Sequence, residues 1–407
     1  MLAENQLETQ VHPTELLNHT KDSILFTTVR PDIVMERGEG MYLWDTDGNQ
    51  YLDFIGGWAV NVLGHAPAVV LQALQQQASQ LVLASPAYYN RPMLEFASRL
   101  TSLSGLERAF FMSTGAEANE GAIKLARRHG VRNLGGAYEI VTTVNSFHGR
   151  TLAAMSATGK PQWESLFAPK VPGFRHVPLN DIEALLEAIT PNTCAVMLEL
   201  IQGEGGVHEA HPEYVKLLRQ LCDEKSLLLI IDEVQTGLGR TGKLFAHEHY
   251  GIQPDVMTLG KAIGGGYPLS AMLVKEAYNI FEPGDQGGTY TGQPLGMAVG
   301  LAVVNAIVEQ DLSGRAAVQG QYLMQQLQCI APRFGLANVR GKGLLIGFDL
   351  PEANGGQVVA KCLQEGLLVN SPSARTIRLM PALIVTQADT DAMIAKLERV
   401  LYRIYPV

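Results

Sequence analysis

The chain has 407 residues, of which 46% are apolar and 17% are charged, and its formal net charge is −9. This length exceeds the size at which one hydrophobic core keeps growing, so we expect two domains. The negative charge, together with the lack of any dense run of Lys and Arg, argues against nucleic acid or an anionic membrane as the main partner and favours small metabolites.

The cysteines and the start of the chain indicate the compartment. The four cysteines, at positions 194, 222, 329 and 362, are too far apart for a CxxC motif and too few to staple a chain this long. The first 23 residues show no basic stretch followed by an apolar core. No window reaches the ~18 uninterrupted apolar residues of a membrane span. We therefore expect a cytoplasmic protein without an export signal and without a metal site.

The hydrophobic pattern changes along the chain. Residues 41–54 alternate around an Asp-Gly, which predicts a β-hairpin in a small sheet near the N-terminus. From about residue 68, apolar runs at 140–144, 194–198 and 227–231 alternate with helical stretches, which indicates a buried parallel sheet. One long helix over 294–310 is expected to lead into an α+β domain, where strands around 344–350 and 377–379 alternate with two amphipathic helices.

Polar residues directly after apolar strands are the first candidates for a site, because parallel sheets bind ligands at the carboxyl ends of their strands. Asp232 follows the apolar run 227–231. Its carboxylate could stay ionised opposite a cation such as a protonated pyridine nitrogen. Taken alone, an Asp at a strand end is more often a helix cap or a turn residue.

The segment FMSTGAEANE, residues 111–120, carries a short strand through Ser113, Thr114 and Gly115 into a helix. Free amides and the positive helix end could form a phosphate cup there. An ordinary N-cap with a glycine turn explains the same pattern equally well.

The segment DVMTLGKAIGGG, residues 255–266, places Lys261 just past a strand and before three glycines. Partial burial would lower the pKa of this lysine and let it act as a Schiff-base nucleophile. By itself the segment favours a surface lysine. It matches neither GxxxxGK[ST] nor GxGxxG, so it is not a nucleotide-binding loop.

Together, these segments resemble the class III branch of the fold type I aminotransferases that depend on pyridoxal 5′-phosphate (PLP), and the likeness to acetylornithine aminotransferases is close. The stretches that carry it are WDTDGNQYLDF, NVLGH, STGAEANEGAIKLAR, SFHGRT, LELIQGEGGV, IIDEVQTGLGRTGKLFAHEHYGIQPDVMTLGKAIGGG, GGTYTGQPLG and IRLMP. The resemblance implies an α/β fold with a large PLP-binding domain, residues 59–302, around a mainly parallel seven-stranded sheet. It also implies a smaller α+β domain built from residues 1–58 and 303–407.

The resemblance also implies how the cofactor is held. Lys261 would carry PLP as a Schiff base and, once released, move the proton between substrate and cofactor. Asp232 would pair with the pyridine nitrogen, and Gln235 would lie near the ring hydroxyl. Val234 would pack under the ring and Phe147 would stack on its other face. The alternative for both residues is simple core packing.

The phosphate group would be bound at the predicted helix start. Gly115 and Ala116 would supply backbone amides, with the Thr114 hydroxyl close by. Thr289 is expected to reach the phosphate of the neighbouring subunit's cofactor. The resemblance thus implies a homodimer with active sites at the interface.

Two arginines match the substrate requirements that the resemblance implies, because guanidinium groups bind carboxylates in a bidentate way. Arg150 would hold the carboxylate far from the reacting amine, and Arg378 the α-carboxylate of glutamate or 2-oxoglutarate. Glu204 would mask Arg378 during the first half-reaction and swing away in the second. The alternative for each arginine is a structural salt bridge. His148 is left out of the catalytic set, because it could as easily hydrogen-bond its own loop.

The sequence departs from the family pattern where specificity is set. Trp58 stands where relatives carry a smaller aliphatic residue or a tyrosine, so it should narrow the substrate pocket. Gly288, Thr291 and Gln293 replace an expected Ser, Gly and Asn, and the missing serine at 288 removes one contact to an acyl group. These changes affect the donor rather than the PLP chemistry.

The predicted function is transfer of the terminal amine of an ω-amino acid, with N-acetyl-L-ornithine favoured, to 2-oxoglutarate, giving a semialdehyde and glutamate. Such an activity would belong to arginine biosynthesis. Ornithine, succinyl-diaminopimelate and GABA are alternative donors. A PLP aminomutase or decarboxylase, or a non-catalytic PLP-binding protein, is a rival of another class.

Overall fold

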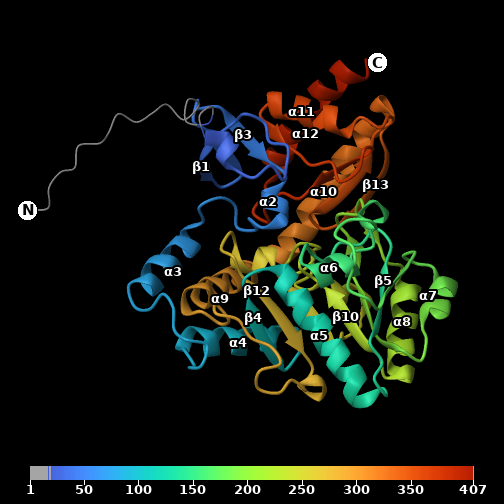
Figure 1. Cartoon of the computed structure of the whole chain (residues 1–407). Helices are drawn as coiled ribbons and strands as arrows, with labels where there is room; N and C mark the ends of the chain where they lie inside the picture. Colours follow the sequence, from blue (N-terminus) through green and yellow to red (C-terminus); the bar gives the residue numbers. More distant parts are fainter. Residues whose placement is uncertain (1–16, 18–19, 407) are drawn as a thin grey trace, which may run out of the picture.

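The computed structural model describes residue 17 and residues 20–406 (Figure 1). The predicted absence of an export signal concerns residues 1–23, most of which lie outside the described residues. Among the residues described, no single helix is long and apolar enough to cross a membrane. The helices Pro294–Glu309 (α9) and Leu312–Phe334 (α10) pass that test only together, as a pair bent by 63°.

A seven-stranded sheet forms the centre of the chain. Its order is β4-β12-β11-β10-β7-β5-β6. β12 pairs antiparallel with both of its neighbours, and the pairs among the other strands are parallel, so the prediction of a mainly parallel seven-stranded sheet is confirmed. The runs at 140–144, 194–198 and 227–231 form β5, β7 and β10 within one residue. The strands are Arg108–Met112 (β4), Glu139–Thr143 (β5), Phe174–Val177 (β6), Thr193–Leu198 (β7), Leu228–Asp232 (β10), Val256–Leu259 (β11) and Ser270–Val274 (β12).

Helices cover both faces of this sheet, which is why its central strands are continuous apolar runs. In β10, Ile230 packs into the cluster that includes Ile123 of α5, whereas Ile231 packs into the cluster that includes Leu218 of α8. α5 and α8 therefore lie on opposite faces (Figure 1). The helices of this part are Ala68–Ala78 (α3), Arg91–Ser104 (α4), Gly115–Asn133 (α5), Leu152–Ala157 (α6), Ile182–Ala188 (α7), Pro212–Lys225 (α8) and Pro294–Glu309 (α9).

The predicted hairpin over 41–54 is confirmed, because β2 and β3 pair antiparallel. Asp45 accepts hydrogen bonds from the amides of Asp47 and Asn49 and thereby holds the turn. The sheet also contains β15, which pairs parallel with β3, so the N-terminal hairpin and the C-terminal part share one sheet. The strands are Met35–Glu39 (β1), Tyr42–Asp45 (β2), Gln50–Asp53 (β3) and Leu367–Leu368 (β15).

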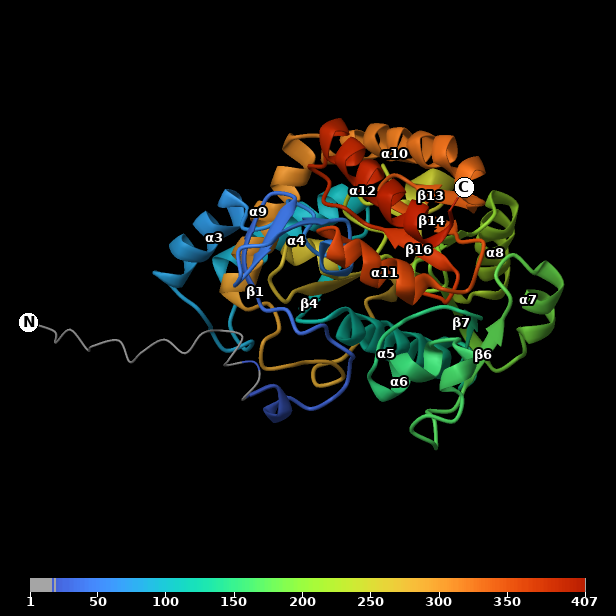
Figure 2. The same cartoon turned by 90° about the horizontal axis from the view of Figure 1, so that it is seen from above.

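The helix predicted over 294–310 is α9, and three helices follow it rather than the predicted two. The chain bends by 63° at Asp311, whose left-handed backbone (φ 45°) lies between α9 and α10. Figure 2 shows α10 and α12 packed side by side. The elements here are Leu312–Phe334 (α10), Ala337–Lys342 (β13), Leu345–Asp349 (β14), Gly355–Gln364 (α11), Thr376–Leu379 (β16) and Gln387–Ile404 (α12), with the sheet order β13-β14-β16.

Short elements complete the path of the chain. They are the helix Gly56–Ala59 (α2), the strand pair Ile201–Gln202 (β8) and His208–Glu209 (β9), and the 3-10 turns Lys21–Ser23, Pro161–Trp163, Ala246–Tyr250, Lys261–Gly264 and Glu276–Tyr278.

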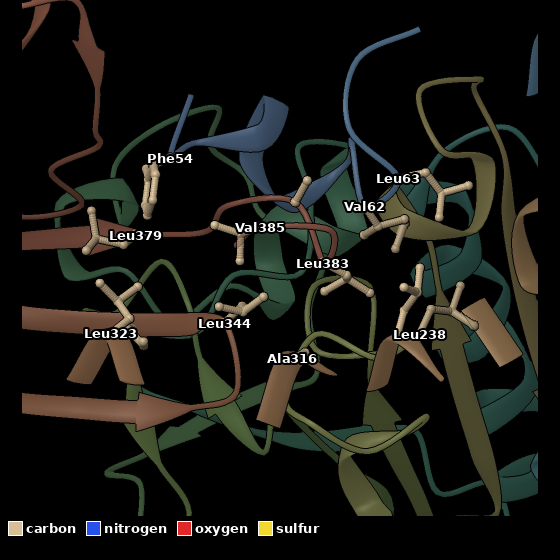
Figure 3. Close-up of a cluster of buried hydrophobic side chains, with 14 of the residues drawn as sticks. Phe54, Val62, Leu63, Leu238, Ala316, Leu323, Leu344, Leu379, Leu383 and Val385 are labelled. Atoms are coloured by element: carbon tan, nitrogen blue, oxygen red, sulfur yellow. The ribbon is translucent and has the colours of Figure 1, made fainter. Parts of the chain in front are cut away.

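One hydrophobic cluster joins the N-terminal, central and C-terminal parts. Phe54, Leu238, Leu344 and Leu379 belong to it and are all buried (Figure 3). Leu379 directly follows Arg378, so this cluster fixes the strand that carries a predicted substrate residue. The division into residues 59–302 and the two flanking segments stays a prediction, with boundaries that fall inside α2 and α9. Residues 1–16, 18–19 and 407 of the flanking segments lie outside the described residues.

Candidate active site

Several of the predicted site residues lie at one edge of the central sheet, where the carboxyl ends of its parallel strands meet. Gly115 follows β4, Asp232 ends β10, and Lys261 follows β11. Phe147 comes shortly after β5, and Glu204 lies beyond β7. Residues far apart in the sequence are therefore brought to one place by the strand order.

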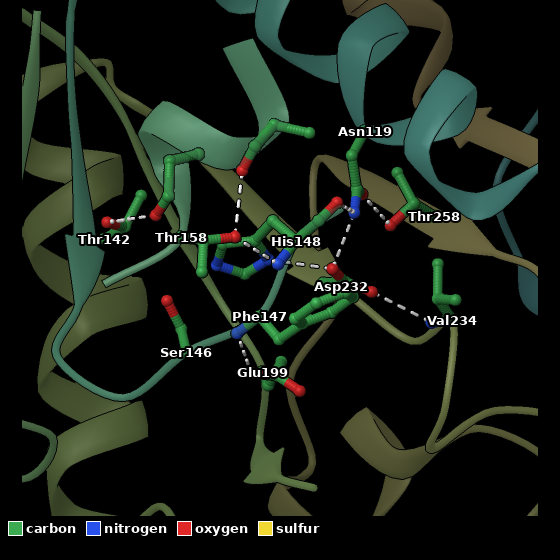
Figure 4. Close-up of polar contacts among 12 residues, drawn as sticks. Asn119, Thr142, Ser146, Phe147, His148, Thr158, Glu199, Asp232, Val234 and Thr258 are labelled. Atoms are coloured by element: carbon green, nitrogen blue, oxygen red, sulfur yellow. Dashed lines mark hydrogen bonds and ion pairs between the residues drawn. The ribbon is translucent and has the colours of Figure 1, made fainter. Parts of the chain in front are cut away.

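Asp232 lies in a buried hydrogen-bond network (Figure 4). Its Oδ2 accepts a hydrogen bond from Asn119 Nδ2 at 2.7 Å and lies 2.8 Å from His148 Nδ1. Thr258 Oγ1 in turn donates to Asn119 Oδ1 at 2.7 Å. The other oxygen, Oδ1, accepts from the Val234 amide at 3.0 Å, so the residue also forms the turn after β10. Asn119, His148 and the Val234 amide thus hold the Asp232 carboxylate in place.

Three members of this region are absent from the predicted site: Asn119 and Glu199 were not singled out, and His148 was considered but left out. Asn119 lies one turn into α5 within the STGAEANE stretch, and His148 lies within SFHGRT next to Phe147. Glu199, within LELIQGEGG, is buried and accepts a hydrogen bond from the Phe147 amide at 2.9 Å. Burial, with a further contribution from the Asp232 charge, raises the pKa of Glu199 to about 7. The motifs contained all three residues, but only the fold shows that they converge.

Lys261 is not a surface lysine. Burial, reinforced by the positive charge of Arg378, lowers the pKa of its amine to about 8. Its backbone adopts the left-handed region with φ 45°, a strained conformation for a residue other than glycine. A side chain at the preceding Gly260 would come within 3.0 Å of Val234 and 3.2 Å of Gly115. Gly260 therefore lets the segments that carry Gly115, Val234 and Lys261 pack closely together.

The start of α5 is an N-cap, one of the two explanations that the sequence allowed, and its first backbone amides are open to the other. Thr114 is an N-cap whose hydroxyl donates to Glu117 Oε2 at 3.0 Å and accepts from the Glu117 amide at 3.3 Å. The amides of Gly115 and Ala116 begin the helix and have no acceptor within it. This end can therefore bind an anion through its backbone while the Thr114 side chain holds the cap.

Gly288 and Thr289 lie on an exposed loop. Together with Thr291 they line a hollow that also includes Ser113 and Glu117. The loop therefore lies beside the start of α5. The expected contact of Thr289 with a second subunit stays a prediction.

Arg378 is fully buried and bound by several acceptors. Its Nη2 lies 2.6 Å from Glu204 Oε1 and 2.7 Å from Asn370 Oδ1, and its Nη1 donates to Gln235 Oε1 at 3.4 Å. Although burial raises the pKa of Glu204, the Arg378 charge lowers it below its ordinary value overall. The structure thus brings Glu204 against Arg378, as the resemblance implied.

The other predicted arginine lies on an aromatic ring that the sequence did not single out. The guanidinium of the exposed Arg150 lies 4.8 Å from the ring centre of Trp163. The Trp163 ring also contacts that of Phe147 edge-on at 5.9 Å. Lys160 Nζ lies 5.3 Å and 5.1 Å from the centres of the Phe147 and Trp163 rings. These residues form a cationic, aromatic wall.

Trp58 lies in a left-handed turn. Residues 56–59 all have positive φ, and Trp58 itself has φ 62° with 53% of its surface exposed. The turn follows the hairpin, whose β3 ends at Asp53. A large ring in a strained backbone is unusual away from functional sites.

The arrangement fits a flat, phosphorylated pyridine. Gln235 Nε2 is buried and has no hydrogen-bond partner among the described residues, so it is free to meet a ring substituent. A side chain at Gly203 would clash with Gln235 Oε1, so the glycine keeps this amide in place. Asp232, the Lys261 amine and the amides at the start of α5 are the groups needed by the ring nitrogen, the aldehyde and the phosphate.

Comparisons with known proteins cover nearly the whole chain. The family model described as aminotransferase class-III matches residues 27–401. The acetylornithine aminotransferase of Caldanaerobacter subterraneus is 45% identical, covering 96% of this chain and 100% of that protein. Acetylornithine aminotransferase 2 of Bordetella bronchiseptica is 48% identical, covering 93% and 97%.

Solved structures agree with these relatives. The ornithine aminotransferase from Toxoplasma gondii superposes with a TM-score of 0.92 at 30% identity, covering 98% of this chain and 96% of that one. The acetylornithine aminotransferase from Elizabethkingia anophelis gives 0.86 at 32% identity, covering 97% and 100%. With a family match over most of its length and relatives above 40% identity, the chain belongs to the class-III aminotransferases, which are PLP-dependent enzymes of fold type I.

Proposed function

We propose that this aminotransferase moves the terminal amine of N-acetyl-L-ornithine to 2-oxoglutarate, giving the semialdehyde and L-glutamate. The observation that carries the proposal is the ion pair between Glu204 and Arg378 at 2.6 Å. An arginine that can be masked lets one pocket accept two different substrates. In the donor the α-carboxylate lies far from the reacting amine, whereas in the acceptor it lies beside the reacting carbon. The names of relatives at 45–48% identity support this donor.

Lys261 and Asp232 would do the acid–base work. When bound, PLP supplies an electron-withdrawing ring that stabilises negative charge at the substrate carbon and stores the amino group between half-reactions. Lys261 Nζ would hold the cofactor and then take the proton from the substrate carbon that bears the amine. The Asp232 carboxylate would keep a proton on the ring nitrogen, supported by His148 and Asn119. Val234 and Phe147 would bound the two ring faces, and Gln235 would meet the ring hydroxyl.

The arginines would place the substrates. Arg150 would bind the carboxylate of N-acetyl-L-ornithine that lies far from the reacting amine, while Glu204 remains on Arg378. In the second half-reaction Glu204 would leave and Arg378 would bind the α-carboxylate of 2-oxoglutarate. Because Arg378 is fully buried, it needs an anion in either state.

The phosphate site supports a homodimer. Gly115 and Ala116 would bind the phosphate of their own subunit through backbone amides, and Thr289 would reach that of the neighbouring subunit. Loop residues 287–290 are exposed in the single chain, so they are available to a second copy.

Ornithine is the second candidate donor, because ornithine aminotransferase from Toxoplasma gondii superposes over almost the whole chain.

Product analysis separates the donors and the reaction classes. The reaction with N-acetyl-L-ornithine should consume one 2-oxoglutarate for each glutamate formed. The kcat/KM for this donor should be higher than that for ornithine or GABA. Repeated turnover of any amine without consumption of 2-oxoglutarate would indicate an aminomutase or decarboxylase instead.

A further inference from the structure

Glu204 lies between two cations. Its Oε1 is 2.6 Å from Arg378 Nη2, and its Oε2 is 3.7 Å from Lys160 Nζ. Arg378 and Lys160 are the cations that form ion pairs with Glu204 among the described residues. The positive charge of Lys261 also helps to lower the pKa of Glu204. In the proposed function, however, the Lys261 amine is occupied by the cofactor.

The position of Lys160 is fixed by its aromatic neighbours. Its ammonium lies over the rings of Phe147 and Trp163, at 5.3 Å and 5.1 Å from their centres. Only 13% of the side chain is exposed. Such cation–π contacts hold a positive charge without neutralising it. Lys160 is therefore a preformed cation that lies near the Glu204 oxygen not bonded to Arg378.

The two states of the proposed reaction place different demands on Glu204. With an ω-amine bound, the carboxylate can remain on Arg378. With a substrate α-carboxylate on Arg378, two anions would compete for one guanidinium, and Glu204 must find another partner. A half-buried carboxylate displaced from its cation would otherwise be desolvated and unpaired.

We propose that Lys160 is this second partner, so that Glu204 moves from Arg378 to Lys160 when Arg378 binds a substrate α-carboxylate. Lys160 is then a positioning residue that affects which amine reacts. It favours amino groups that lie beside an α-carboxylate, as in glutamate, over terminal amino groups. The inference rests on the proposed function, because it assumes that Arg378 binds the α-carboxylate.

The test compares two amine donors on the same PLP-loaded enzyme, with Lys160→Met as the variant. Single-turnover reactions with L-glutamate require Glu204 to leave Arg378, whereas those with N-acetyl-L-ornithine do not. Removing the charge of a partly buried ion pair should lower the apparent second-order rate constant for glutamate about fivefold or more, mainly through weaker binding. The rate constant for N-acetyl-L-ornithine should change by less than about twofold. Lys160→Arg should restore most of the glutamate rate.

Lys170→Met is the matched control, because Lys170 pairs with the exposed Glu164 and should leave both rate constants unchanged. Titration with glutarate, an unreactive dicarboxylate, gives a second readout, and its Kd should rise in Lys160→Met. Equal losses with both donors, or no loss with glutamate and unchanged glutarate binding, would overturn the assignment. If the wild type reacts with glutamate but not with N-acetyl-L-ornithine, the proposed donor fails, while glutarate binding still decides the role of Lys160.

Discussion

The Glu204 carboxylate lies 2.6 Å from the Arg378 guanidinium, although the two residues are 174 positions apart in the chain. Arg378 is on β16 and fully buried, whereas Glu204 is on the loop beyond β7 and half-buried. Because a buried guanidinium is costly without an anion, the site should hold either Glu204 or a substrate carboxylate there.

Arg378→Ala should damage the glutamate half-reaction more than the ω-amine half-reaction. Losing a bidentate, buried carboxylate contact should lower the glutamate rate constant on the order of 100-fold. Single-turnover rates with each donor measure the difference, and Arg333→Ala, which removes a surface pair with Glu398, is the control. Equal losses with both donors would count against the assigned role.

Lys261→Ala should keep the fold and abolish turnover, because the variant lacks both the nucleophile and the proton carrier. We expect kcat to fall by a factor on the order of 10⁴ or more. Steady-state assays and thermal unfolding measure the two effects, and Lys243→Ala, at an exposed position, is the control. A variant that retains wild-type rates would end the mechanism.

Asp232→Asn should lower kcat about 100-fold or more while changing the melting temperature little, because Asn119 and His148 can still contact an amide. Asp255→Asn is the contrasting variant. Asp255 is buried and pairs with Arg219 and Lys275 away from the site. It should lose stability, by about 3 kcal/mol, and keep its kcat. Loss of kcat in both variants, or in neither, would contradict the assignment.

The pKa of Lys261 predicts a pH profile for cofactor uptake by the apoprotein. Only the neutral amine is nucleophilic, and burial lowers its pKa from 10.5 to about 8. The uptake rate should therefore rise roughly tenfold per pH unit below pH 8 and level off above it. Stopped-flow absorbance measures this rate. A rate that keeps rising towards pH 10 would indicate an ordinary, exposed lysine.

Trp58→Gly should widen the donor range without destabilising the protein. Glycine relieves the strain of the left-handed backbone at φ 62°, which should raise the free energy of unfolding by about 1 kcal/mol. The greater freedom of the unfolded glycine chain offsets this gain. Since the ring is 53% exposed, little packing is lost. The kcat/KM values for N-acetyl-L-ornithine and bulkier ω-amines should converge, and an unchanged ratio would show that Trp58 does not restrict the pocket.

The sequence predicted the parts of this site that lie within short motifs. Asp232 and Lys261 were singled out because each follows a predicted apolar strand, and the resemblance to the class III aminotransferases assigned their roles. Lys160 and Trp163 were missed because the segment that contains them has no periodicity and no strand before it. Asn370 was missed because its contact with Arg378 depends on the turn between β15 and β16. The additional C-terminal helix, α10, was missed because its separation from α9 depends on one left-handed residue, Asp311.

The most direct test of the account is the visible absorption of the PLP-loaded protein after N-acetyl-L-ornithine is added alone, with ornithine and GABA in parallel. If N-acetyl-L-ornithine is the donor, it should cause a selective loss of the cofactor band, and 2-oxoglutarate should restore the band. No change with N-acetyl-L-ornithine, together with a response to another amine, would contradict the proposed donor.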